Sequence, residues 1–136
     1  MIDYSRENFL ERVKEITKGA GVPVVYDSVG KDTFDRSIEC LRRFGMMVSF
    51  GNASGPVPPI DFAKVLKGSL FLTRPSLMQY TARREDLMAT AKDLFEIVLS
   101  GKVKIEVNQR YPLREAAHAH RDLEARKTTG STILLP

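Results

Sequence analysis

The chain has 136 residues, of which 43% are hydrophobic and 28% charged, and its 21 basic and 17 acidic residues give a net charge of +4. This composition is ordinary for a soluble globular protein, and no apolar stretch approaches the roughly 20 residues that span a bilayer. The charges are interspersed and the aromatic pattern of an RNA-binding sheet is missing, so we expect neither membrane nor nucleic-acid binding. The start lacks a signal-peptide pattern and the lone cysteine cannot form an internal disulfide, so a cytoplasmic location is expected.

The first part of the chain predicts a helix, a strand and a second helix. Residues 6–18 carry apolar side chains at helical spacing after a candidate cap at Ser5, and glycines follow. The run 22–26 is short, rich in valine and almost entirely apolar, which is typical of a strand buried on both faces. A helix is then expected from about residue 33 to 43.

A second apolar strand at residues 45–50 completes a strand–helix–strand unit. Crossovers of this length join parallel strands, so the order of elements indicates an α/β fold rather than an α+β fold. A proline-rich loop at 55–59 leads to a short helix at 61–67, whose apolar side chains are expected to point inward. A third strand is predicted at 69–73.

Two helices and two strands are predicted in the remainder of the chain. Thr81 is a candidate cap for a long helix at about 82–100. Residues 103–107 alternate apolar and charged side chains, which is typical of a half-exposed strand at an edge or in a different sheet. A helix at about 114–126 and a strand at 131–135 follow.

Three turns that follow the predicted strands are the candidate functional sites. Ligands of open parallel sheets bind beyond the carboxyl ends of the strands, so residues 27–30, 50–55 and 74–77 are expected along one edge. The first turn carries Ser28 and ends in a glycine before a helix, so its N–H groups can approach an anion or a ribose. An ordinary strand-to-helix turn explains the same residues equally well.

The second turn suits a flat ring. Phe50 supplies an aromatic wall, Gly51 lets a ring approach the backbone, and the Asn52 amide both donates and accepts. These features fit a nicotinamide ring or its ribose, although glycine and asparagine also occur in plain turns. Arg74 is a candidate for holding a phosphate or carboxylate, although an arginine at a strand end is more often only solvated. The phosphate-binding pattern G-x-G-x-x-G does not occur in these residues.

Other reactive residue types give no catalytic or metal site. His118 and His120 lie two apart on a predicted helix and cannot share a metal, and His120 falls on the apolar stripe, where packing is the simpler role. Cys40 has no C-x-x-C partner and is expected to be a buried small hydrophobe. No G-x-S-x-G nucleophile motif is found. We therefore predict no catalytic residue and no metal ligand in this chain.

Eight short segments, each modest alone, form a specific pattern when they are taken in order. They are Ile2–Tyr4, Leu10–Thr17, Val25–Gly30, Val48–Asn52, Gly68–Leu70, Thr73–Leu77, Tyr111–Leu113 and Ala119–His120. In these segments, and so over essentially its whole length, the chain resembles the zinc-free quinone oxidoreductases of the medium-chain dehydrogenase/reductase superfamily. The family reduces quinones with NADPH in a two-domain subunit that dimerises.

The resemblance implies a fold and a set of cofactor contacts. It implies the C-terminal half of a Rossmann-like doubly wound parallel sheet at 1–101, and at 102–136 a strand–helix–strand segment that packs with the catalytic domain of a full-length relative. Tyr4 looks like the family's tyrosine near the adenosine 2′-phosphate, and Arg126 resembles a late arginine that reaches the cofactor. The other implied contacts are Ser28, Val29, Phe50, Gly51, Asn52, Arg74, Ser76 and Leu77. Ala53 stands where relatives often place a serine.

The quinone pocket and the phosphate-binding loop of the family are not found in this sequence. We therefore expect a fragment of an NADPH-dependent quinone oxidoreductase that binds NADPH weakly and is nearly inactive alone. The alternative is a stand-alone, non-catalytic oligomerising or binding module built on half a Rossmann fold. Strand 22–26 lacks its usual neighbour and strand 69–73 forms the family's dimer seam, so a homo-oligomer through one of these strands is expected.

Overall fold

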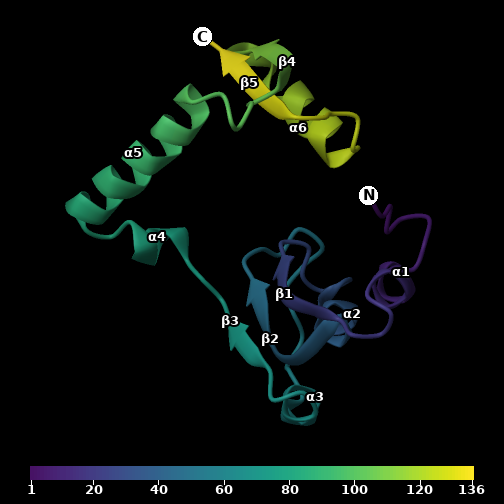
Figure 1. Ribbon diagram of the computed structural model, residues 1–136. Coiled ribbons are helices and arrows are strands. Elements are labelled where there is room, and N and C mark those ends of the chain that lie inside the picture. The colour runs from purple at the N-terminus through teal and green to yellow at the C-terminus, as the bar shows by residue number, and fades with distance from the viewer. The chain divides into compact units, whose positions relative to one another are not determined.

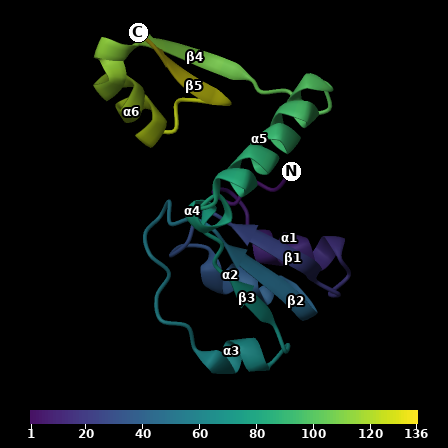
Figure 2. The ribbon, with the colours of Figure 1, turned by 90° about the vertical axis from the view of Figure 1, so that its left-hand side faces the viewer.

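The computed structural model describes residues 1–136, which divide into two compact units, Met1–Tyr80 and Thr81–Pro136. Figures 1 and 2 show the helices and strands of both units from two directions. All strand pairs are parallel and the strands alternate with helices along the chain, so the predicted α/β fold is confirmed. The predicted domain boundary between residues 101 and 102 refers to full-length relatives and stays a prediction.

The first unit is a parallel sheet with its helices. Its elements are α1 (Phe9–Ile16), β1 (Val22–Asp27), α2 (Phe34–Glu39), β2 (Leu41–Ser49), α3 (Phe62–Leu66), β3 (Phe71–Thr73) and α4 (Leu77–Tyr80). The strands lie in the order β1-β2-β3, with β2 in the centre (Figure 1). Because every crossover connects neighbouring strands in the same direction, the carboxyl ends of the strands, and the turns that follow them, meet at one edge.

The core of this unit lies between α2 and one face of the sheet. Val25, Met47 and Leu72 are paired in register across the strands, so their side chains share that face. Met47 is fully buried and packs with Phe34 and Ile38 of α2. The alternation of side chains thus places the same face of each strand against the helix.

The opposite face of the sheet is exposed along β1, which corrects the prediction that the strand at 22–26 is buried on both faces, although Val48 of β2 is buried on that face. Val24, Met46 and Phe71 are in register there, and they are 38%, 39% and 57% exposed. The helix residues Phe62 and Leu66, expected to point inward, are 84% and 77% exposed. The buried cluster of this unit, formed by Phe34, Ile38 and Met47, lies on the α2 side of the sheet, and Phe62 and Leu66 are not among the residues packed against it.

Two helix boundaries differ from the prediction. α1 begins after Asn8, whose side chain accepts from the Leu10 N–H at 3.1 Å, and not after Ser5. Ser5 instead bonds to the carboxylate of Asp3. α2 ends at Glu39 rather than near residue 43, because Leu41 pairs with Val22 and begins β2. Pairing with a neighbouring strand has overridden the helical spacing of the side chains.

The second unit contains α5 (Arg84–Leu99), β4 (Val107–Pro112), η1 (Leu113–Glu115), α6 (Ala116–Glu124) and β5 (Ser131–Leu135). β4 and β5 pair in parallel, with α6 between them along the chain. The strand predicted at 103–107 is displaced, since pairing with β5 begins only at Val107. α5 begins after Arg83 instead of Thr81, and His120, expected to pack, is exposed while its neighbour Ala119 is buried. No helix of the chain has the length and apolar character needed to cross a lipid bilayer.

Candidate functional site

Asp27, the last residue of β1, is buried and organises the turn that follows it. One carboxylate oxygen accepts from the backbone N–H groups of Val29 and Gly30, at 2.8 and 2.9 Å. The other accepts from the hydroxyls of Thr33 and Ser37, at 2.8 Å each. One side chain therefore joins the strand, the turn and the start of α2.

The charge of Asp27 is stabilised by these bonds. Burial alone raises the pKa of a carboxyl group, because it disfavours the charged form. At Asp27 the hydrogen bonds from Gly30, Ser37, Thr33 and Val29 together outweigh that effect and lower the pKa. The group is a carboxylate at neutral pH with both oxygens occupied, so its role is to position the turn and not to accept a proton.

Backbone hydrogen bonds join the turn after β1 to the loop after β2. The Ala53 N–H donates to the Ser28 carbonyl at 3.1 Å. The Val29 carbonyl accepts from the N–H and from the hydroxyl of Ser54, at 2.8 Å each. Residues 27–30 and 50–55, which we call the joined loops, therefore form one fixed surface at the carboxyl edge of the sheet.

Two glycines make this close contact possible. A Cβ atom on Gly30 would lie 2.6 Å from the Gly55 carbonyl oxygen, and one on Gly51 would lie 2.4 Å from the Ser28 carbonyl oxygen. Gly30 also has a φ of +88°, which side-chain-bearing residues rarely adopt. Neither position has room for a side chain, so both glycines are required by the approach of backbone to backbone.

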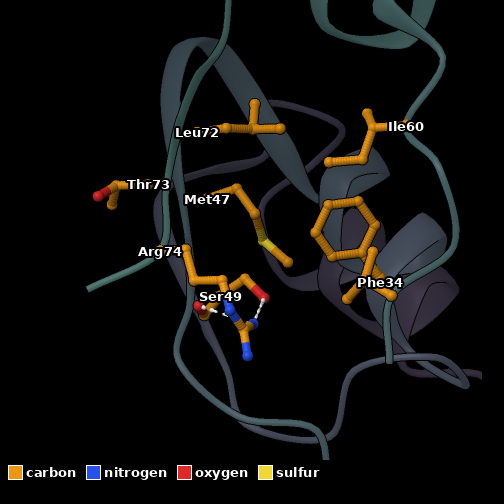
Figure 3. Close-up of a pocket in the computed structure, with 8 residues that line it drawn as sticks. Phe34, Met47, Ser49, Ile60, Leu72, Thr73 and Arg74 are labelled. Atoms are coloured by element: carbon orange, nitrogen blue, oxygen red, sulfur yellow. Dashed lines mark hydrogen bonds between the residues drawn. The ribbon is translucent and has the colours of Figure 1, made fainter. Parts of the chain in front are cut away.

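Arg74 brings the turn after β3 to the same edge. Its Nη1 donates to Oγ and to the carbonyl oxygen of Ser49, at 3.2 and 3.4 Å (Figure 3). With the Asn52 amide oxygen turned toward it, Nη2 donates to that oxygen at 3.1 Å, and the amide nitrogen donates to the Gly51 carbonyl at 2.9 Å. Arg74 thus holds the Asn52 side chain in a defined orientation.

An open apolar pocket of about 430 Å³ lies on the sheet face opposite α2. Its aromatic part is formed by Tyr26 and Phe50, whose rings meet edge to face with centroids 6.5 Å apart. Val48, Pro75, Leu77 and Tyr80 complete the lining. An exposed aromatic and aliphatic surface of this kind suits the face of a flat ring.

The residues implied as cofactor contacts fall into two groups. The structure brings together Ser28, Val29, Phe50, Gly51, Asn52 and Arg74 at the joined loops, with Leu77 in the pocket beside Phe50. Ser76 precedes α4, and its carbonyl accepts from the Tyr80 N–H at 3.1 Å. Their roles as cofactor contacts stay predictions.

The other two implied contacts, Tyr4 and Arg126, lie elsewhere in the chain. Tyr4 lies half-exposed in a turn before α1. Arg126 belongs to the second unit, where it follows α6 with a left-handed φ of 57° and donates its N–H to the Leu123 carbonyl at 3.0 Å. That backbone conformation is the usual helix-ending one, although glycine is the usual residue there.

Several positioning residues were missed by reasoning from the sequence. The sequence predicts Asp27 only as part of a turn, and it does not mark Ser49 or Ser54 as functional. A signal exists for Asp27, because an acid at a strand end with a glycine three residues on is typical of a side chain that bonds the turn's N–H groups. For the two serines no signal exists, since their partners come from distant parts of the chain.

Three candidate metal ligands, Asp122, His118 and Cys40, have other surroundings in this structure. The Asp122 carboxylate accepts from the Tyr111 hydroxyl at 2.9 Å and pairs with His118 at 3.1 Å, and the hydrogen bond from Tyr111 lowers the pKa of Asp122. Cys40 is buried, and burial raises the pKa of its thiol. No three His, Cys, Asp or Glu side chains are arranged to hold a metal ion, so the residues present do not form a zinc site.

Comparison with known proteins gives extensive matches. A quinone oxidoreductase of Pseudomonas aeruginosa is 54% identical over 136 residues, which are 99% of this chain and 42% of the relative. A 2-haloacrylate reductase of Burkholderia sp. is 47% identical over 137 residues, which are 99% of this chain and 41% of that protein. The chain thus spans less than half the length of these relatives.

A solved structure also matches nearly the whole of this chain and less than half of its own. The structure of Escherichia coli quinone oxidoreductase complexed with NADPH matches with a TM-score of 0.93 and 50% identity, over 99% of this chain and 42% of that one. This match confirms that the sheet is half of a Rossmann-like fold, followed by a strand–helix–strand segment. A family model described as zinc-binding dehydrogenase matches residues 1–134. The chain therefore belongs to the zinc-binding dehydrogenase family, and within the medium-chain dehydrogenase/reductase superfamily it is similar to the quinone oxidoreductases.

Proposed function

We propose that this chain forms the part of an NADPH-dependent quinone oxidoreductase that holds the nicotinamide end of the cofactor. The observation that carries the proposal is the fixed surface of the joined loops, which holds Ser28, Phe50 and Asn52 at the carboxyl edge of the sheet. Relatives described as quinone oxidoreductases, and one such structure in complex with NADPH, support the choice of substrate and cofactor.

In the proposed site the protein binds and orients the cofactor. NADPH, when bound, supplies the hydride that reduces the quinone. The Asn52 amide, oriented by Arg74, has hydrogen-bonding capacity for the carboxamide or ribose, and the exposed Ser28 hydroxyl has the same capacity. The pocket beside Phe50 offers an apolar surface for the ring. No residue of this chain is assigned a proton-transfer role.

The 136 residues alone are proposed to bind NADPH weakly and to reduce quinone little or not at all. The joined loops offer neutral polar groups and a ring surface, and nothing among the residues described makes a glycine-rich loop for the cofactor's pyrophosphate. A cytoplasmic location is also proposed, and it is supported by the free thiol of Cys40.

The proposal is tested by exchange of corresponding segments. The aligned segment of the Pseudomonas aeruginosa relative is replaced by this chain, and quinone-dependent oxidation of NADPH by the chimera is measured. We expect activity in the chimera, and we expect Asn52→Ala to raise the KM for NADPH about tenfold, the effect of one lost hydrogen bond. Ser131→Ala, an exposed serine of β5, is the control and should leave the KM unchanged.

The chimera also distinguishes the proposed function from its alternative. A folded chimera that oxidises no NADPH would overturn the proposal and favour a non-catalytic binding module. If the chimera is active but Asn52→Ala and Ser28→Ala both leave the KM for NADPH unchanged, the joined loops do not bind the cofactor.

A further inference from the structure

A second pocket, of about 220 Å³, lies on the α2 side of the sheet. Figure 3 shows Phe34 and Ile60 on one side of it and Met47 and Leu72 on the other. Val57 completes the apolar walls. Apolar cavities smaller than this one hold a benzene molecule in other proteins, so the volume is sufficient for a single aromatic ring.

One end of this pocket carries the polar groups of Arg74 and Ser49 (Figure 3). Arg74 bonds only to neutral acceptors, the oxygens of Ser49 and Asn52, and takes part in none of the chain's ion pairs. Its guanidinium therefore keeps an unneutralised charge and unused N–H groups. The Ser49 hydroxyl is buried and accepts from Arg74, and its own hydrogen has no acceptor among the chain's hydrogen bonds.

We propose that this pocket binds a small aromatic monocarboxylate. The ring would lie between the two apolar walls, and the carboxylate would accept from the Arg74 guanidinium and the Ser49 hydroxyl. Arginine and carboxylate form charge-assisted hydrogen bonds, which are stronger than those between neutral groups. The combination of apolar walls with one unneutralised cation selects an anion with an apolar body over a neutral ring or a hydrophilic anion. This inference goes beyond the proposed function and does not depend on NADPH binding.

The test is a titration of the ¹⁵N-labelled 136-residue chain with benzoate, and in parallel with benzyl alcohol, which has nearly the same shape but no charge. We expect benzoate to shift the backbone signals of Ser49, Leu72 and Arg74, with an affinity about tenfold higher than that of benzyl alcohol. Arg74→Gln should reduce the affinity for benzoate about tenfold. Arg42→Gln, at an exposed arginine, is the matched control and should leave the affinity for benzoate unchanged.

Two further variants test the apolar wall and the hydroxyl group of the pocket separately. Ile60→Trp, at a position that is 40% exposed, places a larger side chain over the pocket and should abolish benzoate binding. Ser49→Ala removes the hydroxyl without adding volume and should weaken benzoate but not benzyl alcohol. Equal affinities for the two probes, shifts confined to other residues, or unchanged binding by Arg74→Gln would each overturn the proposal. Because Ile60 lies outside the joined loops, a loss of benzoate binding in Ile60→Trp with unchanged NADPH binding separates the two sites.

Discussion

Asp27 ties β1, the following turn and α2 together through one buried carboxylate. Asp27→Ala leaves four donors without their acceptor, and we expect it to lower the free energy of unfolding by about 3 kcal/mol. Asp27→Asn keeps one oxygen acceptor and should cost about half as much. The measurement is urea-induced unfolding followed by circular dichroism. Asp32→Ala, at an exposed carboxylate nearby, is the control, and an effect of Asp27→Ala no larger than this control would contradict the assignment.

The same carboxylate makes stability depend on pH. The folded-state pKa of Asp27 is lowered, because its hydrogen bonds outweigh the opposing effect of burial, so the unfolded chain binds the proton more readily. The stabilisation is therefore fully present above the unfolded pKa, about 4, and is lost as the pH falls through the folded pKa. We expect the difference in unfolding free energy between wild type and Asp27→Asn to shrink below about pH 4. A difference that stays constant from pH 7 to pH 2 would show that the charge of Asp27 is not involved.

At the residue scale, the sequence identifies the residues of the turns better than it identifies the hydrogen bonds that fix their conformation. Ser28 and the residues 50–52 are recognisable because polar and glycine residues follow apolar runs directly. The acceptor role of Asp27 is hidden, because the hydroxyls that bond it lie six and ten residues further on, in a different element. The link from Arg74 to Ser49 spans 25 residues and depends on the pairing of β2 with β3.

At the scale of elements, the contact between the joined loops is set by Gly30 and Gly51. Gly30→Ala adds a Cβ that would lie 2.6 Å from a carbonyl oxygen, and we expect it to lower the free energy of unfolding by about 3 kcal/mol. Gly19→Ala is a matched control, because Gly19 has a similar φ of +80° but nothing within 4 Å of the added atom. It should cost about 1 kcal/mol, the effect of the left-handed backbone alone.

Gly51→Ala is the second variant at this contact. Its added atom would lie 2.4 Å from the Ser28 carbonyl oxygen. We expect destabilisation comparable to that of Gly30→Ala, measured by thermal unfolding. Equal stability of the Gly30, Gly51 and Gly19 variants would mean that the two loops do not approach as closely as the structure shows.

The sequence predicts best those elements whose ends are set by residues next to them in the chain. The strand at 131–135 is found with its bounds, and β1 is found to within one residue, because apolar runs end at glycine or polar residues. The end of α2 and the start of β4 are wrong for a shared reason. Leu41 and Val107 each begin a strand where a distant partner becomes available, and no local pattern marks that point.

At the scale of the whole molecule, the sheet of the first unit has two open edges. β2 is paired on both sides, whereas β1 and β3 each have one neighbour. In the edge strand β1, Val24 and Tyr26 are 38% and 73% exposed, so unpaired backbone groups and apolar side chains occur together.

This combination leads to a prediction about self-association. We expect the 136-residue chain to form dimers or larger species at tens of micromolar in sedimentation velocity, through the β1 edge or through β3. Val24→Lys should shift the distribution toward monomer if β1 is the seam, because a charged side chain on an edge strand opposes pairing. Phe71→Lys should do so if β3 is the seam. Val103→Lys is the control, because Val103 lies outside both edges and its exposure of 46% falls between those of Val24 and Phe71. A monodisperse monomer of the wild-type chain would contradict the prediction, and it would show that the exposed sheet face and the two edges remain stable in water without a partner.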